Sequence, residues 1–193
     1  PIGPFTRAAG NPIVPIGGSG SGLLAENMVY DTATSHYWTL FSNTSLQLGL
    51  LWSDNPGDAT SWHWSGTVIN SAFAPHILKY NGTWYIFYAD MGGTNFHNIS
   101  VSTSSSITGP YTYAGTVLSK GLAGSWESYR VDEPYVFRRN DGKWIMAYMA
   151  ETGLTDEQIG YATADNILGP YTKYSGNPCL QFGSPGSFDA GTV

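Results

Sequence analysis

The sequence predicts an all-β fold, a β-propeller of four-stranded antiparallel blades, and two observations carry that prediction. The first is composition: 15% of the 193 residues are aromatic and only 11% are charged, with 24 glycines, which suits short strands and turns. The second is a repeat. A proline, an apolar run, a turn signal and an aromatic-rich run occur at 75–88 and again at 134–148. Repeats with periods of roughly 40–50 residues are typical of propellers.

The clearest copy of the repeat, 131–148, predicts a β-hairpin. Asp132 and Glu133 stand before Pro134, which fits the first residues of a strand because no ladder hydrogen bond is needed there. The Asn-Asp-Gly sequence at 140–142 favours a tight turn between two apolar runs. The hairpin therefore has two carboxylates at its open end, opposite the turn.

Further strand candidates complete each repeat. A Gly-Pro-Tyr-Thr phrase at 109–112 and 169–172 comes before the last strand of a unit, and a weaker hairpin at 26–41 has Asn27 in the proline position. We predict repeats at roughly 13–69, 70–118 and 119–180, with partial strands at both ends. Because propellers have at least about four blades, we expect 1–193 to be a single propeller domain that is incomplete.

Composition also limits the partners and the compartment. The net charge is −6 and the pI near 4.9, which argues against nucleic acid, and no apolar run is long enough for a membrane span. Cys179 is the single cysteine, so no internal disulfide forms, and no zinc-ligand spacing is present. We expect a carbohydrate partner, no membrane association, and a secreted or periplasmic location.

Several phrases together resemble glycoside hydrolase family 43. They are the Phe-Ala-Pro-His-Ile sequence at 73–77 with Asn-Gly-Thr-Trp-Tyr at 81–85, the stretch 131–144, and Ala-Thr-Ala at 162–164 leading to Gly-Pro-Tyr at 169–171. The resemblance covers nearly the whole chain. It implies a five-bladed propeller, of which three consecutive blades are present here. It also implies inverting hydrolysis of arabinose- or xylose-containing plant polysaccharide by a base, an acid and a third carboxylate.

The resemblance assigns catalytic residues position by position. The general base falls near Glu26, although Glu-Asn stands here where the family has Asp-Pro. The carboxylate before the blade-opening proline falls on Glu133 if spacing to the proline decides, and on Asp132 if residue type decides. The general acid would lie beyond Val193. From the residues alone, Asp132 and Glu133 are also compatible with a solvated pair near arginines.

Other residues are candidates for substrate binding. Phe73 and Trp126 precede first strands and would stack on sugar rings, and Arg130 is a further candidate. His76 would face the axis and hold substrate, or would be satisfied by backbone partners. Glu127 and Asp189 occupy equivalent places in two repeats, which favours a structural role, and Asp189 is the better functional candidate of the two.

The function predicted is therefore a glycoside hydrolase. Two alternatives stay open at this point: a non-catalytic carbohydrate-binding propeller, and a related propeller enzyme that acts on fructan, agar or mannoside substrates. We predict no cofactor. No calcium-loop pattern surrounds the acidic residues at 54, 58 and 90, and a structural or axial calcium ion is left open.

Overall fold

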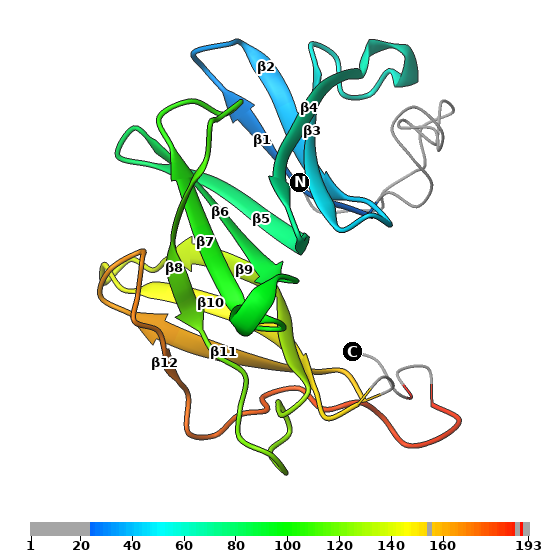
Figure 1. Cartoon of the computed structure of the whole chain (residues 1–193), viewed down its shortest axis with the longest axis vertical. Coiled ribbons are helices and arrows are strands. Elements are labelled where there is room, and N and C mark those ends of the chain that lie inside the picture. Colours follow the sequence, from blue (N-terminus) through cyan, green and yellow to red (C-terminus); the bar gives the residue numbers. More distant parts are fainter. Residues whose placement is uncertain (1–23, 154–155, 188–189, 191–193) are drawn as a thin grey trace.

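The computed structural model describes residues 24–153, 156–187 and 190, with backbone alone at 24–26 and 95. The described residues form three antiparallel sheets of four strands each (Figure 1). Blade 1 consists of β1 (Leu24–Asp31), β2 (His36–Ser42), β3 (Gln47–Ser53) and β4 (His63–Asn70). Blade 2 consists of β5 (Ala72–Tyr80), β6 (Thr83–Asp90), β7 (Ile99–Ser104) and β8 (Thr112–Leu118). Blade 3 consists of β9 (Arg130–Arg138), β10 (Trp144–Glu151), β11 (Gln158–Ala164) and β12 (Thr172–Lys173).

Strands that follow one another in the chain are neighbours in each sheet, so every blade is an antiparallel meander. Two short 3-10 turns, η1 (Ala59–Ser61) and η2 (Gly93–Asn95), lie in connections. The prediction of four-stranded antiparallel blades is confirmed. Within the part of the chain that the structure describes, no helix has the length and hydropathy to cross a membrane.

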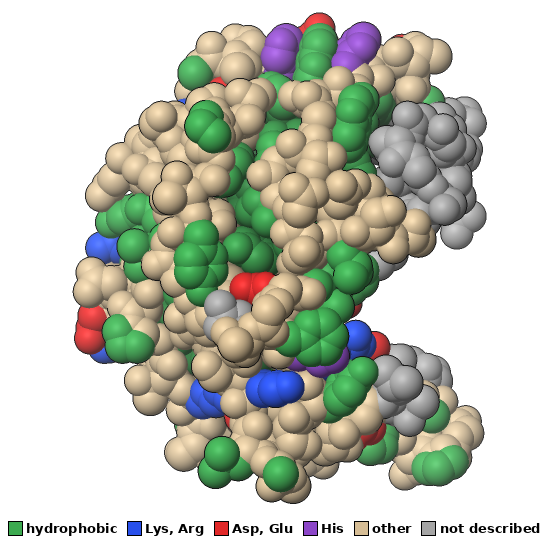
Figure 2. Space-filling model, viewed as in Figure 1, with side chains coloured by type: hydrophobic (Ala, Val, Ile, Leu, Met, Phe, Trp, Pro, Cys, Tyr) green, Lys and Arg blue, Asp and Glu red, His purple; other side chains and the backbone are tan. Residues whose placement is uncertain are grey.

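The three blades follow one another around an arc. The first strand of blade 2, β5, contacts the first strands of both neighbours, β1 and β9. These three strands therefore lie side by side, and the later strands of each blade extend away from them (Figure 1). In the space-filling view the molecule is C-shaped, with a notch between the parts formed by blades 1 and 3 (Figure 2).

Two apolar clusters hold the blades together. One joins blades 2 and 3 and includes Phe87, Val101, Val136 and Met146, all buried. The other contains buried residues of blades 1 and 2, such as Leu40, Leu50, Ile77 and Ile86. A buried aromatic or aliphatic side chain stabilises the fold by about 1.5–3 kcal/mol relative to an exposed one. Blade-to-blade packing is therefore what fixes the positions of β1, β5 and β9.

Candidate functional site

Each first strand carries a two-residue bulge at the same place. The pairing with the second strand skips from Ala25 to Met28 in blade 1, from Phe73 to His76 in blade 2, and from Asp132 to Tyr135 in blade 3. The residues skipped are Glu26 and Asn27, Ala74 and Pro75, and Glu133 and Pro134.

This register makes Glu26, Ala74 and Glu133 equivalent residues. Ala74 and Glu133 share a left-handed backbone, with φ of 46° and 47°. Such angles are uncommon for residues other than glycine, and bulges of this kind re-aim the side chain. In this register Glu133, and not Asp132, is the positional counterpart of Glu26.

A pocket of about 180 Å³ lies among the three bulges. Residues from all three first strands line it: Asn27 from β1, Pro75 and His76 from β5, and Glu133, Pro134 and Tyr135 from β9. Of the predicted catalytic and binding residues, Glu133 and His76 are thus brought together. For Glu26 the structure describes the backbone only, which lies next to pocket-lining Asn27.

The carboxyl of Glu133 has a raised pKa although the residue is exposed. Burial of the carboxyl is the largest cause, the negative charge of Glu157 adds to it, and Arg130 opposes it. A raised pKa makes a carboxyl better suited to hold a proton or to share one with a neighbouring acid.

Asp132 lies in a different environment, a buried charge cluster beside the pocket. Its side chain is 2% exposed, and its Oδ2 is 3.2 Å from Nε of Arg130. The same guanidinium pairs with Glu151, and its Nη2 lies 3.8 Å from Oε1 of Glu157. Burial raises the pKa of Asp132 to about 7; the cation at Arg130 opposes this rise, and the neighbouring carboxylates reinforce it.

The guanidinium of Arg130 is the ion-pair partner of three carboxylates, those of Asp132, Glu151 and Glu157. Oδ1 of Asp132 and Oε2 of Glu151 are buried without a hydrogen-bond partner among the described residues, and Oε1 of Glu151 has the Arg130 guanidinium as its ion-pair partner. The geometry places Arg130 in ion pairs and does not place it among the residues that line the pocket. The roles predicted for Asp132 and Arg130 in catalysis and substrate binding stay predictions.

His76 has a backbone partner and also lines the pocket. Its Nε2 is 3.1 Å from the carbonyl oxygen of Val136, and its ring packs 4.6 Å from that of Tyr135. Burial lowers the pKa of His76 to about 4, and the bond to Val136 only partly opposes this. The imidazole is therefore neutral at neutral pH.

The remaining candidates lie outside the pocket lining. Phe73 is half-buried opposite Ala89, just before the bulge of blade 2. Trp126 packs 5.8 Å from the ring of Tyr148, within the packing of blade 3. Their predicted contacts with sugar stay predictions, and Asp189 lies outside the described residues.

Glu127, for which the sequence favoured a structural role, is hydrogen-bonded within blade 3. Its Oε2 accepts a 3.0 Å hydrogen bond from the hydroxyl of Tyr148, and its Oε1 lies 2.7 Å from Nζ of Lys173. The side-chain amide of Asn177 donates to the same hydroxyl. The segment that carries Trp126 is thereby anchored to the strands of the blade.

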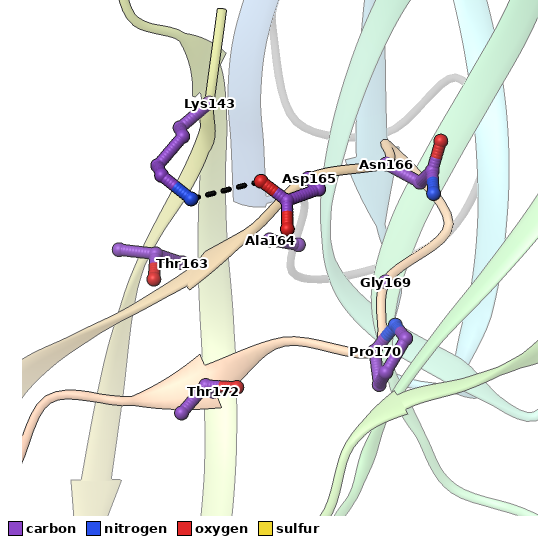
Figure 3. Close-up of a pocket in the computed structure, with 8 residues that line it drawn as sticks. All are labelled: Lys143, Thr163, Ala164, Asp165, Asn166, Gly169, Pro170 and Thr172. Carbon is purple, nitrogen blue, oxygen red and sulfur yellow. Dashed lines mark hydrogen bonds and ion pairs between the residues drawn. The ribbon is translucent and has the colours of Figure 1, made fainter.

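A second pocket, of about 460 Å³, lies at the other end of blade 3, near the hairpin turns (Figure 3). An ion pair between Lys143 and Asp165 spans 2.8 Å across it, and Pro170 forms part of the wall (Figure 3). No bulge residue lines it, so it does not bring the predicted carboxylates together. Among the described residues, no group of three or more His, Cys, Asp or Glu is arranged to hold a metal ion.

Asn27 and Tyr135 line the first pocket and were not among the predicted site residues. A signal for each was present in the sequence. Asn27 departs from the proline of the other two repeats, and Tyr135 follows Pro134 as His76 follows Pro75. What the repeats did not reveal was the bulge, which turns these positions toward one pocket.

Comparison with known proteins bears on the fold and on the family of the chain. No curated protein matched the chain. Among solved structures, the chain is similar to an endo-1,4-β-xylanase from Bacteroides thetaiotaomicron VPI-5482, with a TM-score of 0.69 and 21% identity over 85% of this chain and 57% of that one. It is also similar to a family 117 glycoside hydrolase from the marine bacterium Zobellia galactanivorans, with a TM-score of 0.67 and 20% identity over 81% of this chain and 56% of that one.

A third similar structure is the α-L-arabinofuranosidase PaAbf62A from Podospora anserina, with a TM-score of 0.63 and 12% identity over 83% of this chain and 52% of that one. The chain thus spans a little over half the length of each of these proteins. At these identities the likeness shows the propeller fold.

The sequence model described as glycosyl hydrolases family 43 matches residues 26–132, which is more than half of the chain. The resemblance seen in the sequence is therefore confirmed, and this chain belongs to glycosyl hydrolases family 43.

Proposed function

We propose that this protein is a glycoside hydrolase that cleaves arabinose- or xylose-containing plant polysaccharide with inversion. The observation that carries the proposal is the equivalence of Glu26 and Glu133, which occupy the same bulge position in two blades that both contribute residues to one pocket. The names of similar structures, a xylanase and an arabinofuranosidase, support the substrate class.

Inverting hydrolysis needs two carboxyl groups with different protonation. One donates a proton to the departing oxygen, and the other removes a proton from a water on the opposite face of the sugar. In this proposal Glu26 is the general base. Glu133 is the third carboxylate, which orients the sugar and raises the pKa of the acid through like-charge repulsion. The pKa of Glu133 is raised mainly by burial of its carboxyl, and the negative charge of Glu157 adds to the rise.

The test replaces each bulge carboxylate by its neutral amide, Glu26→Gln and Glu133→Gln, and measures hydrolysis of arabino- and xylo-oligosaccharides together with binding by calorimetry. We expect turnover to fall by about 10²–10⁴-fold, because a positioned acid or base contributes that much. Binding should change little, because the amide keeps the size of the side chain. The control is Asp165→Asn, which removes an exposed carboxylate in the second pocket.

Four results would decide the matter. Loss of turnover in both Gln variants with binding kept supports the proposal, and an inverted anomer seen by NMR supports its stereochemistry. Unchanged turnover in Glu133→Gln overturns the role of that residue. Tight sugar binding by a wild-type protein that hydrolyses none of the substrates would identify a carbohydrate-binding propeller.

A further inference from the structure

Two side chains link the first strands of successive blades across the pocket. Asn27 of β1 donates from Nδ2 to the carbonyl oxygen of Ile77 on β5, at 2.8 Å, and its Oδ1 accepts from the N–H of Ile77 at 3.0 Å. His76 of β5 lies with Nε2 3.1 Å from the carbonyl oxygen of Val136 on β9. Because a carbonyl oxygen only accepts hydrogen bonds, Nε2 of His76 carries the proton.

The two links end on equivalent residues. Ile77 and Val136 each stand two residues after the bulge proline position of their blade, and each forms the second pair with the second strand after the bulge. A first strand is hydrogen-bonded along one edge only, so some of its peptide groups point away from the sheet. Asn27 and His76 satisfy such groups from the preceding blade, which makes the link a repeated feature.

The second link does not depend on protonation near neutral pH. His76 is 6% exposed, and burial keeps its pKa near 4, well below neutrality. The ring of Tyr135 packs against it on the pocket side. Burial and the bond to Val136 are the causes of the shift, and no charged group contributes to it. His76 is therefore a constant neutral donor.

We propose that Asn27 and His76 are positioning residues that set the separation of the two bulge carboxylates, Glu26 and Glu133. The inference rests on the function proposed above. Asn27 follows Glu26 in the chain, and residues 76 and 77 are consecutive, so the path from one bulge to the other crosses only two non-covalent links. In an inverting enzyme the carboxyl separation decides whether a water fits, and a 1 Å misplacement costs on the order of 10²-fold in rate.

The first experiment compares Asn27→Leu with Asn70→Leu. Both replace an asparagine by a side chain of similar size, but Asn70 is exposed and bonds the side chain of Gln47 on the neighbouring strand. We expect kcat of Asn27→Leu to fall by about 10- to 100-fold with KM within about threefold, because the substrate contacts remain while the carboxylates shift. Asn70→Leu should retain kcat. Asn27→Asp, which keeps the acceptor for the Ile77 N–H, is the milder variant if Asn27→Leu folds poorly.

The second experiment dissects His76. His76→Gln places an amide donor near the position of Nε2, whereas His76→Phe keeps a ring and loses the donor. We expect His76→Gln to retain most of kcat and His76→Phe to lose about tenfold or more. Equal kcat in wild type, Asn27→Leu and His76→Phe overturns the proposal, as does a rise in KM without a fall in kcat.

The links made by Asn27 and His76 can also be tested by measurements that do not require turnover. The Ile77 amide should exchange its hydrogen faster in Asn27→Leu than in wild type and Asn70→Leu, since Oδ1 of Asn27 is its acceptor. A crystal structure of Asn27→Leu should show a changed separation of Glu26 and Glu133. If the wild type hydrolyses no sugar, the proposed function fails. The positioning of the carboxylates is then tested by the amide exchange and by the crystal structure alone. Unchanged exchange and separation overturn it.

Discussion

Asp132 and Glu133 are neighbours in the chain, yet the bulge sends them into different environments. Asp132 is buried beside Arg130, while Glu133 is exposed and lines the pocket between the blades. Adjacent side chains of a regular strand already point to opposite faces, and the left-handed backbone at Glu133, within the bulge, further re-aims its side chain. Two adjacent carboxyl groups can thereby have different tasks.

The buried position of Asp132 predicts a stability that falls as pH rises. The pKa of Asp132 is raised to about 7 in the folded state, compared with about 3.9 in an unfolded chain. The folded state therefore binds the proton more tightly, and its advantage is complete below about pH 4 and lost as pH rises through 7. The slope from this group is at most about 1.4 kcal/mol per pH unit.

Asp132→Asn should remove that slope, because the amide is neutral at every pH. The measurement is the free energy of unfolding from urea titrations between pH 4 and 8, for wild type and variant. Wild-type stability that rises over this range relative to Asp132→Asn would show instead that the ion pair with Arg130 dominates and that Asp132 is ionised throughout.

The opposite pH dependence is expected at Asp31. Burial alone would raise the pKa of Asp31, but hydrogen bonds from Lys79 and Thr34 outweigh it and lower the pKa. Lys79, on the next blade, approaches Oδ1 at 2.9 Å. The stabilisation is present above the unfolded pKa of about 3.9 and is lost as pH falls below it. Asp31→Asn should lose stability at pH 7 and little at pH 2.5, as thermal unfolding at the two pH values would show.

Two lysines form a matched pair for testing the anchor of the segment that carries Trp126. Lys173 pairs with the buried Glu127, which also accepts a hydrogen bond from the hydroxyl of Tyr148, whereas Lys143 pairs with the exposed Asp165. We expect Lys173→Met to lower the free energy of unfolding by about 1–3 kcal/mol, because Glu127 is left without its cation. Lys143→Met should have a smaller effect. Equal losses in urea titrations would contradict the anchoring role.

Gly49 of β3 has no room for a side chain. A Cβ placed there would lie 2.6 Å from Cζ of Phe41 and would also overlap the ring of Trp64. Phe41 is buried and cannot withdraw, so Gly49→Ala should cost about 1–3 kcal/mol through overpacking. The control is Gly57→Ala, where the added Cβ would be 3.8 Å from Oδ1 of Asn55. A melting temperature of Gly49→Ala equal to that of the control would refute this.

Much of the fold could be predicted because each blade repeats the same local chemistry. Alternation of apolar residues, turn residues such as those at 140–142, and the Gly-Pro-Tyr phrase act over a few residues, so they are visible in the sequence. The site could be predicted in part. Spacing to Pro134 pointed to Glu133 and residue type pointed to Asp132, and the sequence contained nothing that chose between them.

The sequence by itself determined the four-stranded blades, their order and the family, because repetition and short-range patterns encode them. Only the tertiary structure decided which residues meet. Glu133 lines the pocket while Asp132 is buried beside Arg130, and the links from Asn27 to Ile77 and from His76 to Val136 join residues 50 and 60 positions apart. Such contacts depend on how one blade packs on the next, and packing is set by the summed burial of side chains far apart in the sequence.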